Sequence, residues 1–416
     1  MNYIITKPSS PLRASITLPA SKSISNRLLI LNALSRNSRP VENLSDCDDT
    51  RVLQTALEGG NTFDVHAAGT AMRFLTAFCA LTPGEWFLTG SERMKQRPIR
   101  ILVEALRKLG GNISYAEKEG FPPLRIRGGA LQGGELSLPG NVSSQYLSAL
   151  LMVAPCMEQG MTLHIEGALI SRPYIRMTLH LMAQYGVAVK WQGATLRVER
   201  QDYHPPEHIS VEPDWSAASY WYEMVSLLPG SEVRLTGLRH DSKQGDARGA
   251  ELFACFLGVS TTFDDQGVVL RHKPSRCGGL RYDFTNEPDL AQTFAVTCVA
   301  SDIPFRFTGL QSLRIKETDR IDALRCELLK FGIPLLSSDG ILSWNGTRSN
   351  HPTPYPVINT YKDHRMAMAF APLALVRPGG LIITDIDVVE KSYPHFWDDL
   401  RAVGFRVRES IASPSI

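Results

Sequence analysis

The feature that most constrains the fold is an internal repeat. Six segments each join a short polar cluster to a strongly apolar stretch of helical length, and successive segments from the second onward begin about 74 residues apart. The segments are SKSISNRLLILNAL from Ser21, AGTAMRFLTAFCAL from Ala68, VSSQYLSALLMVA from Val142, EPDWSAASYWYEMVSLL from Glu212, EPDLAQTFAVTCVA from Glu287 and DHRMAMAFAPLAL from Asp363. Chance resemblance among the helices of an ordinary α/β protein would not explain this spacing.

A second signal runs in phase with the first. Amphipathic stretches end at Gly110, Gly186, Gly258, Gly332 and Gly404, and glycine is the usual residue at a helix C-terminus. Short alternating runs such as GNISYAE and GVVLRH follow several of these glycines and indicate strands. Each repeat therefore predicts the order strand, buried helix, strand, surface helix, strand, strand, with three repeats in each half of the chain.

The first repeat is shorter than the others. Ser25 and Thr70 occupy corresponding positions but lie only about 45 residues apart. We therefore expect this repeat to lack its outer strands.

Composition narrows the class of protein. A chain of 416 residues with 43% hydrophobic and 21% charged residues favours two globular domains. A net charge of only +2 argues against a dedicated nucleic-acid binder. The seven cysteines are scattered without a CxxC pair, so neither a zinc site nor a disulfide framework is indicated. No apolar run approaches the roughly 18 residues of a membrane-spanning helix, and we expect a cytoplasmic protein without a membrane segment.

The polar clusters predict anion binding. They precede apolar helices, where free backbone N–H groups and the helix dipole attract anions. Capping explains one Ser, Thr or Asp per helix, but it does not explain the cations Lys22, Arg27, Arg73 and Arg365 in the same clusters. The motifs GxxxxGK[ST], GxGxxG, HExxH and GxSxG are absent, so neither a nucleotide-binding loop nor metal or serine-hydrolase chemistry is indicated.

Nine motifs, in order along nearly the whole chain, resemble the EPSP synthase (3-phosphoshikimate 1-carboxyvinyltransferase) family. They are SKSISNR from Ser21, AGTAMR from Ala68, RMKQRPI from Arg93, VSSQ from Val142, SRPYI from Ser171, EPDLAQT from Glu287, RIKETDR from Arg314, DHRMAM from Asp363 and EKSYPHF from Glu390. The resemblance implies a two-domain inside-out α/β fold in which each domain has three βαβαββ repeats. One domain would span residues 20–212, mainly on the shikimate 3-phosphate side. Residues 1–19 and 213–416 would form the other, with much of the phosphoenolpyruvate clamp, and the active site would lie in the interdomain cleft.

The same resemblance implies roles for individual residues. The activity would be transfer of the enolpyruvyl group of phosphoenolpyruvate to the 5-hydroxyl of shikimate 3-phosphate, in aromatic amino acid (chorismate) biosynthesis. Shikimate 3-phosphate would be bound by Lys22, Ser23, Arg27, Ser143, Ser144, Gln145, Ser171, Tyr174, Asp289 and Lys316. Phosphoenolpyruvate would be bound by Lys22, Gly69, Arg97, Gln145, Arg320, Arg365 and Lys391.

Two proton movements accompany this reaction. Asp289 is expected to orient or deprotonate the 5-hydroxyl, although Asp289 alone in the sequence could also be a helix N-cap. Glu317, with Lys22 as the other candidate, is expected to move the proton at C3 of phosphoenolpyruvate. No metal or organic cofactor is expected, because phosphoenolpyruvate brings its own activated enol. The expected partners are the two small substrates alone, with no nucleic acid and no membrane, and the expected state is a monomer.

The chain departs from the family pattern at Ala67 and Phe74, which lie on either side of the second motif, AGTAMR. Phe74 stands where the family often has proline, and Ala67 where many members have asparagine. Together with the short first repeat, these differences predict an altered affinity for phosphoenolpyruvate and for mimics such as glyphosate.

Two other functions compete with this interpretation. One is the related enolpyruvyl transferase that uses UDP-N-acetylglucosamine, but that enzyme typically has a cysteine in the loop where this chain has RMKQRPI. The other is a non-catalytic anion-binding or RNA-binding protein on the same scaffold. Such a protein would need a basic stripe, and the acidic residues Asp289 and Glu317 among the cations argue against it.

Overall fold

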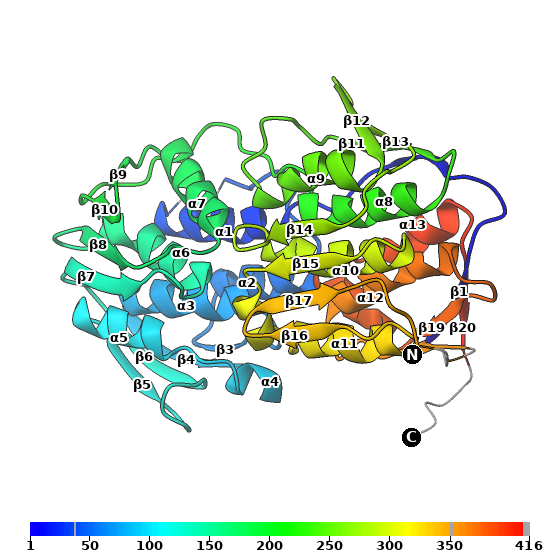
Figure 1. Ribbon diagram of the computed structural model, residues 1–416. Coiled ribbons are helices and arrows are strands. Elements are labelled where there is room, and N and C mark those ends of the chain that lie inside the picture. Colours follow the sequence, from blue (N-terminus) through cyan, green and yellow to red (C-terminus); the bar gives the residue numbers. More distant parts are fainter. Residues whose placement is uncertain (37–38, 350–352, 354, 411–416) are drawn as a thin grey trace. The chain divides into compact units, whose positions relative to one another are not determined.

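The computed structural model describes residues 1–36, 39–349, 353 and 355–410. The chain forms two compact units, one from residues 1–19 and 213–416 and the other from residues 20–212 (Figure 1). Residues 411–416, the end of the predicted second half, lie outside the described part of the chain. We call the first of these units the discontinuous unit and the second the continuous unit.

The discontinuous unit contains three four-stranded sheets with one shared topology. Their strand orders are β2-β11-β13-β12, β14-β15-β17-β16 and β18-β19-β1-β20. In each sheet the first two strands are parallel, and the remaining pairs are antiparallel. The strands are β1 (Tyr3–Thr6), β2 (Arg13–Ile16), β11 (Glu232–Thr236), β12 (Val259–Asp264), β13 (Gly267–His272), β14 (Leu280–Asp283), β15 (Phe305–Thr308), β16 (Leu336–Ser338), β17 (Ile341–Trp344), β18 (Val357–Ile358), β19 (Leu381–Ile383) and β20 (Arg406–Glu409).

The N-terminus completes the last repeat of this unit. Strand β1 pairs antiparallel with both β19 and β20. It therefore lies at the position in the sheet that β17 and β13, each the last strand of its repeat along the chain, take in the other two sheets. A segment at the start of the chain therefore belongs to the same sheet as the segment near its end.

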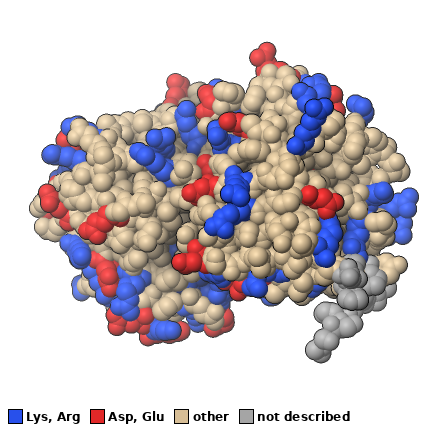
Figure 2. Space-filling view, viewed as in Figure 1, with Lys and Arg blue, Asp and Glu red and all other residues tan. Residues whose placement is uncertain are grey.

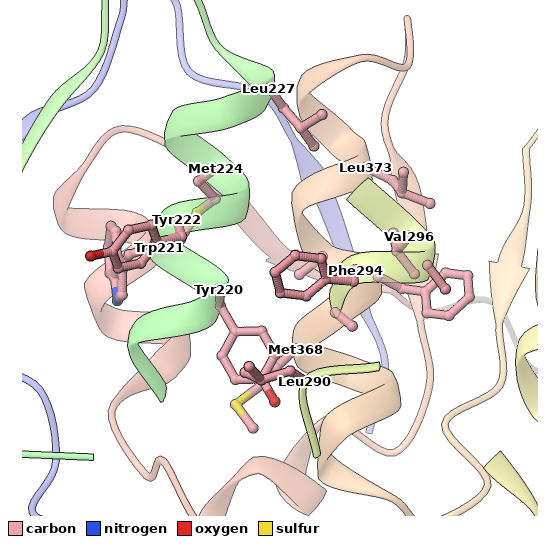
Figure 3. Packing of buried hydrophobic residues seen from close by; sticks show 14 of the residues in the cluster. Tyr220, Trp221, Tyr222, Met224, Leu227, Leu290, Phe294, Val296, Met368 and Leu373 are labelled. Carbon is pink, nitrogen blue, oxygen red and sulfur yellow. The ribbon is translucent and has the colours of Figure 1, made fainter. Parts of the chain in front are cut away.

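Each repeat of the discontinuous unit supplies one helix to the interior. Helices α8, α10 and α12 lie side by side (Figure 1), and nearly all their residues are buried. Figure 3 shows Phe294 of α10 among apolar side chains of α8 and α12, and the rings of Phe253 and Phe294 have centroids 4.6 Å apart. Such close aromatic packing contributes about 0.5–1.5 kcal/mol beyond the burial of apolar area.

The helices of this unit alternate between buried and surface types, as the repeat predicts. They are α8 (Trp215–Leu227), η2 (Gly245–Ala247), α9 (Arg248–Phe256), η3 (Pro288–Leu290), α10 (Ala291–Ala300), η4 (Gln311–Ile315), α11 (Arg320–Leu329), α12 (His364–Phe370), η5 (Ala371–Leu375), η6 (Ile386–Lys391) and α13 (Phe396–Ala402).

The continuous unit contains two sheets of the same topology, β3-β4-β6-β5 and β7-β8-β10-β9. Their strands are β3 (Thr62–Asp64), β4 (Gly84–Thr89), β5 (Asn112–Tyr115), β6 (Leu124–Gly128), β7 (Gly134–Pro139), β8 (Met161–Glu166), β9 (Val189–Gln192) and β10 (Thr195–Val198). The helices are α1 (Lys22–Leu34), α2 (Asp48–Glu58), α3 (Gly69–Leu81), α4 (Glu92–Lys95), α5 (Arg100–Lys108), α6 (Ser144–Val153), η1 (Ala154–Cys156) and α7 (Arg172–Gln184). This arrangement confirms the predicted α/β class and repeat order.

The first repeat is truncated as expected. It retains the two helices α1 and α2, but only residues 59–61 separate α2 from β3, so no strand pair follows α2. What remains of the sheet in the described residues is an isolated parallel bridge between Glu42 and Ser210. Helix α1 nevertheless packs against α3 and α6, because its apolar residues Leu28 and Leu31 are buried in the core of the unit.

Two of the cations do not lie at helix ends as the sequence suggested. Arg27 and Arg73 belong to the second turns of α1 and α3. Arg73 donates hydrogen bonds to the carbonyl oxygens of Gly69, at 3.3 Å, and Pro98, at 3.1 Å. Arg73 therefore joins α3 to the segment after α4, which is a structural task.

The surface carries both signs of charge. Figure 2 shows acidic and basic side chains interspersed on the face in view, in keeping with the net charge of +2. Within the described part of the chain, no helix combines the length and the apolar character needed to cross a membrane.

Candidate active site

Arg320 is the centre of a buried ion-pair network in the discontinuous unit. Its side chain is 1% exposed and contacts three carboxylates. Nε donates to Asp363 at 2.7 Å, Nη1 to Asp289 at 3.0 Å and Nη2 to Glu317 at 2.9 Å. A guanidinium presents five N–H donors in a fixed planar geometry, and here three sides of it meet three different acidic residues.

Helix capping fixes the positions of these groups. Asp319 accepts hydrogen bonds from the backbone N–H groups of Ile321 and Asp322, so α11 begins at Arg320. Asp363 caps α12 by accepting from the backbone N–H of Arg365 at 2.9 Å. The Asp363 carboxylate therefore both starts the helix that carries Arg365 and holds Arg320.

Three further cations join the network. Arg365 Nη2 donates to Asp289 at 3.0 Å, Lys316 Nζ lies 3.6 Å from Asp289, and Lys391 Nζ lies 3.3 Å from Glu317. The six residues that the sequence predicted in this unit are thus brought together, as follows: Asp289, Lys316, Glu317, Arg320, Arg365 and Lys391. In these contacts of the described residues, four cations meet three carboxylates, Asp363 included, which is a formal surplus of one positive charge before the neighbouring Asp246 is counted.

Asp289 is an ionised carboxylate in this setting. Burial raises its pKa, but the positive charges of Arg365, Lys316 and Arg320 outweigh burial and hold the pKa well below its usual range. Burial also lowers the pKa of Lys316, which Asp289 partly offsets. Asp289 lies in η3 and caps neither η3 nor α10, so the alternative that it is only an N-cap is wrong.

Asp246 lies beside this network. It is 4% exposed, and Ser216 Oγ donates a hydrogen bond to its Oδ2. Burial and the negative charge of Asp289 raise the pKa of Asp246 to about 7, although Arg365 opposes them. Near neutral pH this carboxyl group therefore exists in both protonation states.

The continuous unit holds its predicted residues differently. Lys22 is the first residue of α1, where a cation opposes the helix dipole. Its Nζ lies 3.4 Å from Oδ2 of Asp49, in the first turn of α2, and this carboxylate offsets the unfavourable position. Asp49 was not among the predicted residues.

Arg27 is buried among neutral groups. Nε donates to Thr178 Oγ1 at 2.7 Å, Nη2 to Ser148 Oγ at 3.1 Å and Nη1 to the carbonyl oxygen of Ser23 at 2.9 Å. Of the described residues, none that carries a carboxylate pairs with it. Burial lowers the pKa of Arg27 to about 10, and the nearby Tyr174 hydroxyl raises it slightly, so the guanidinium stays charged at neutral pH.

Arg97 packs against the start of α3. A Cβ atom at Gly69 would lie 2.5 Å from its Nη1, so the guanidinium lies directly against the Gly69 backbone. In the described residues Arg97 has no carboxylate partner either. Gln145, at the start of α6, donates from Nε2 to Thr70 Oγ1 at 3.0 Å and so joins the starts of α6 and α3.

The predicted phosphate-binding serines sit at two helix N-termini. Ser143 caps α6 by accepting from the backbone N–H of Gln145 at 3.3 Å, and Ser144 is the first residue of that helix. Ser171 precedes α7 with φ of 52°, a left-handed conformation that is costly for a residue with a Cβ. As far as the described residues show, no hydrogen bond joins Ser171 to Ser143 or Ser144.

Sequence reasoning missed the residues that hold the site together. Asp363, Thr178 and Ser148 contact predicted residues directly. Asp363 opens the cluster DHRMAM, but nothing in the local sequence pairs it with Arg320, 43 residues away. In the described part of the chain no group of His, Cys, Asp and Glu residues could hold a metal ion.

Comparisons with known proteins point to one family. The sequence profile of "EPSP synthase (3-phosphoshikimate 1-carboxyvinyltransferase)" matches residues 6–59 and 54–400. The chain is 54% identical over 411 residues to a 3-phosphoshikimate 1-carboxyvinyltransferase of Bacteroides fragilis, covering 98% of this chain and 99% of that one. It is 36% identical over 430 residues to the protein of that name from Photobacterium damsela subsp. piscicida, covering 96% and 99%.

A solved structure agrees on the fold. The EPSP synthase of Acinetobacter baumannii superposes with a TM-score of 0.77, covering 98% of this chain and 100% of that one, at 20% sequence identity. This confirms the predicted two-domain inside-out α/β fold. On the evidence of the profile and of its full-length relatives, the chain belongs to the EPSP synthase family.

Proposed function

We propose that the two groups of residues described above bind shikimate 3-phosphate and phosphoenolpyruvate and act on them together. As a member of its family, the protein transfers the enolpyruvyl group of phosphoenolpyruvate to the 5-hydroxyl of shikimate 3-phosphate, a step of aromatic amino acid biosynthesis. The hydroxyl oxygen bonds to C2 and loses its proton, while C3 gains one. The tetrahedral intermediate then loses the C3 proton and phosphate, and the enol ether is formed.

The Arg320 network carries this proposal. Phosphoenolpyruvate bears a carboxylate and a phosphate, and Arg320, Arg365 and Lys391 offer it two guanidinium forks and a mobile ammonium group. We assign Arg97, Lys22, Gln145 and the backbone of Gly69 to the same substrate. The surplus positive charge and the burial of the network both favour an anionic ligand.

The acceptor falls to the continuous unit in this proposal. Ser143, Ser144 and Ser171 would bind its phosphate at the starts of α6 and α7, where free backbone N–H groups attract anions. Arg27 and the Ser23 hydroxyl would bind its carboxylate, with Tyr174 beside the ring. The buried Arg27 charge supports this assignment, because a buried cation without a carboxylate gains most from an anion brought by a ligand.

The carboxylates of the network would move the protons. The lowered pKa of Asp289 suits a base or an orienting acceptor for the 5-hydroxyl, and Lys316 would stand beside that hydroxyl. Glu317, held between Arg320 and Lys391, would carry the proton to and from C3, with Lys22 as the second candidate. General acid–base catalysis of this kind contributes about 10²–10⁴-fold to the rate.

The same observations favour a monomeric, cytoplasmic enzyme without nucleic-acid partners. Every residue assigned above comes from one chain, so no second copy is needed to complete the site. All seven cysteines are free, which suits a reducing compartment. No cofactor is included, since phosphoenolpyruvate supplies the activated enol.

Phosphate release tests the proposal. The full-length protein should release phosphate from phosphoenolpyruvate with shikimate 3-phosphate and not with UDP-N-acetylglucosamine. Turnover with the sugar nucleotide alone would assign it to the related enolpyruvyl transferase activity, and ligand binding without turnover would favour a non-catalytic role.

Replacement of Glu317 tests the proton assignment. Glu317→Gln should lower kcat by about 10²-fold or more, whereas Glu251→Gln, an exposed carboxylate of α9, should leave kcat within about twofold of the wild type. An unchanged kcat in Glu317→Gln would remove this residue from the mechanism.

A further inference from the structure

Phe74 contacts a predicted substrate-binding residue that lies on another helix. Its ring, 1% exposed, lies under the Arg27 guanidinium, with Cζ of Arg27 5.4 Å from the ring centroid. Arg27 belongs to α1 and Phe74 to α3. The sequence linked Phe74 with phosphoenolpyruvate, but its ring reaches the cation assigned to the carboxylate of shikimate 3-phosphate.

The surroundings of Arg27 leave a distinct task for this ring. The hydrogen bonds to Thr178, Ser148 and the Ser23 carbonyl come from α7, α6 and α1 and engage all three guanidinium nitrogens. These hydrogen bonds act at the edges of the planar group. The Phe74 ring adds a contact of a different kind, because an aromatic face attracts a cation that lies over it and so opposes its displacement.

Phe74 also suits the charge requirement of the site. A carboxylate in its place would neutralise Arg27 and compete with an anionic ligand. An aliphatic residue would keep Arg27 available but would leave the buried cation with its three neutral hydrogen-bond partners as its compensation. The aromatic ring stabilises the cation through its quadrupole while carrying no net charge.

We propose that Phe74 is a positioning residue that holds the Arg27 guanidinium at the orientation in which it binds the acceptor carboxylate. The inference rests on the proposed function, since it assumes that Arg27 binds shikimate 3-phosphate. It assigns to Phe74 an effect on the acceptor and none on phosphoenolpyruvate. Phe74 itself touches no substrate in this assignment.

The first test replaces Phe74 by leucine. Phe74→Leu keeps an apolar side chain at the site but removes the ring, and it should raise the dissociation constant and the KM of shikimate 3-phosphate about fivefold to tenfold. The KM of phosphoenolpyruvate should stay within about twofold of the wild type. The matched control is Phe78→Leu, one turn further along the same helix and only partly buried, for which both KM values should be unchanged.

A double-mutant cycle separates positioning from packing. Arg27→Lys replaces the planar fork by a point charge that cannot stack on the ring in the same way. If Phe74 acts through Arg27, Phe74→Leu should have little further effect on shikimate 3-phosphate binding in the Arg27→Lys background. A purely structural role would give the same fold-change in both backgrounds.

A second variant serves if Phe74→Leu does not fold. Phe74→Met also removes the ring but keeps an unbranched, adaptable apolar side chain, and it should raise the KM of shikimate 3-phosphate selectively. An equal rise for both substrates in Phe74→Leu, or in Phe74→Met where it is the variant used, would overturn the inference. Wild-type protein that neither binds nor turns over shikimate 3-phosphate would instead overturn the proposed function.

Discussion

The two units compensate their buried positive charges in different ways. In the discontinuous unit, Arg320, Arg365 and Lys391 are each paired with a carboxylate. In the continuous unit, Arg27 is held by hydroxyls, a carbonyl and an aromatic ring, and Arg97 by backbone packing. Lys22 is the exception in that unit, because it pairs with Asp49. Both arrangements bury cations, but only the first neutralises most of their charge within the protein.

This difference matches the chemistry assigned to each unit. A network with its own carboxylates can accept and return protons while it binds an anion. Cations without carboxylate partners cannot move protons between acidic groups. When an anionic ligand binds to them, it faces little competition from carboxylates of the protein. We infer that the network of the discontinuous unit serves both anion binding and proton transfer, whereas Arg27 and Arg97 of the continuous unit serve binding alone.

The largest expected effect tests whether the paired network is structural as well as catalytic. Asp363→Ala leaves the buried Arg320 without one of its carboxylates and removes the cap of α12. The free energy of unfolding should fall by about 3–5 kcal/mol, as when one partner of a buried ion pair is removed. Urea titration would measure this loss. The control Asp322→Ala breaks an exposed pair with Arg325 and should cost less than about 1 kcal/mol; equal losses would mean that the network contributes no special stability.

The second prediction removes a buried charged group from the continuous unit. Arg27→Met keeps much of the side-chain volume and removes a buried charge that has no carboxylate partner, so the free energy of unfolding should change by less than about 1 kcal/mol. The dissociation constant of shikimate 3-phosphate should rise by about 100-fold or more, because a charge-assisted contact is lost. Calorimetry and urea titration would measure the two quantities, with Arg176→Met, an exposed residue of α7, as control. A stability loss as large as that of Asp363→Ala would remove the contrast between the units.

The third prediction concerns pH. Because the pKa of Asp246 is raised to about 7 in the folded state, well above the usual range of an aspartate, the folded state binds the proton more tightly than the unfolded state. Stability from this residue is therefore present below about pH 4 and is lost as the pH rises through about 7. Asp246→Asn should increase the free energy of unfolding by about 2 kcal/mol more at pH 8 than at pH 5. The exposed Asp241→Asn should show no such difference, and a pH-independent effect of Asp246→Asn would contradict the expected ionisation.

The smallest effect concerns the packing of Arg97. Gly69→Ala places a Cβ atom 2.5 Å from Nη1 of Arg97 and must displace the guanidinium. The KM of phosphoenolpyruvate should rise about tenfold, equivalent to about 1.4 kcal/mol, while the KM of shikimate 3-phosphate changes little. Gly129→Ala is the control, since a Cβ there meets nothing within 4 Å. Steady-state kinetics with both substrates varied would show whether the effect is confined to phosphoenolpyruvate.

Part of this site was predictable because polar clusters in the sequence mark where its helices begin. The polar clusters before α3, α6 and α12 mark the positions of Gly69, Ser143 and Arg365. The partners of these residues were not predictable, because they come from other repeats. Asp363 with Arg320, and Thr178 with Arg27, are 43 and 151 positions apart.

Phe74 shows what local reasoning leaves open, and its predicted effect on phosphoenolpyruvate affinity stays a prediction. Its position beside AGTAMR suggested an influence on phosphoenolpyruvate, through Gly69 of the same helix. Phe74 lies five residues further along α3, so its side chain points to a different side of the helix and meets α1. The sequence supplies the periodicity of a helix but does not say which neighbour each face meets.

By itself, the sequence determined the repeat, the α/β class, the short first repeat and the types of residue gathered at helix starts. These follow from the periodicity of apolar residues and from glycine at helix ends, both of which are local properties. Only the tertiary structure decided which cations are paired with carboxylates and which are left among neutral groups. That decision depends on long-range packing, because a buried charge is stabilised or left uncompensated by whatever side chains the other repeats bring within a few ångströms of it.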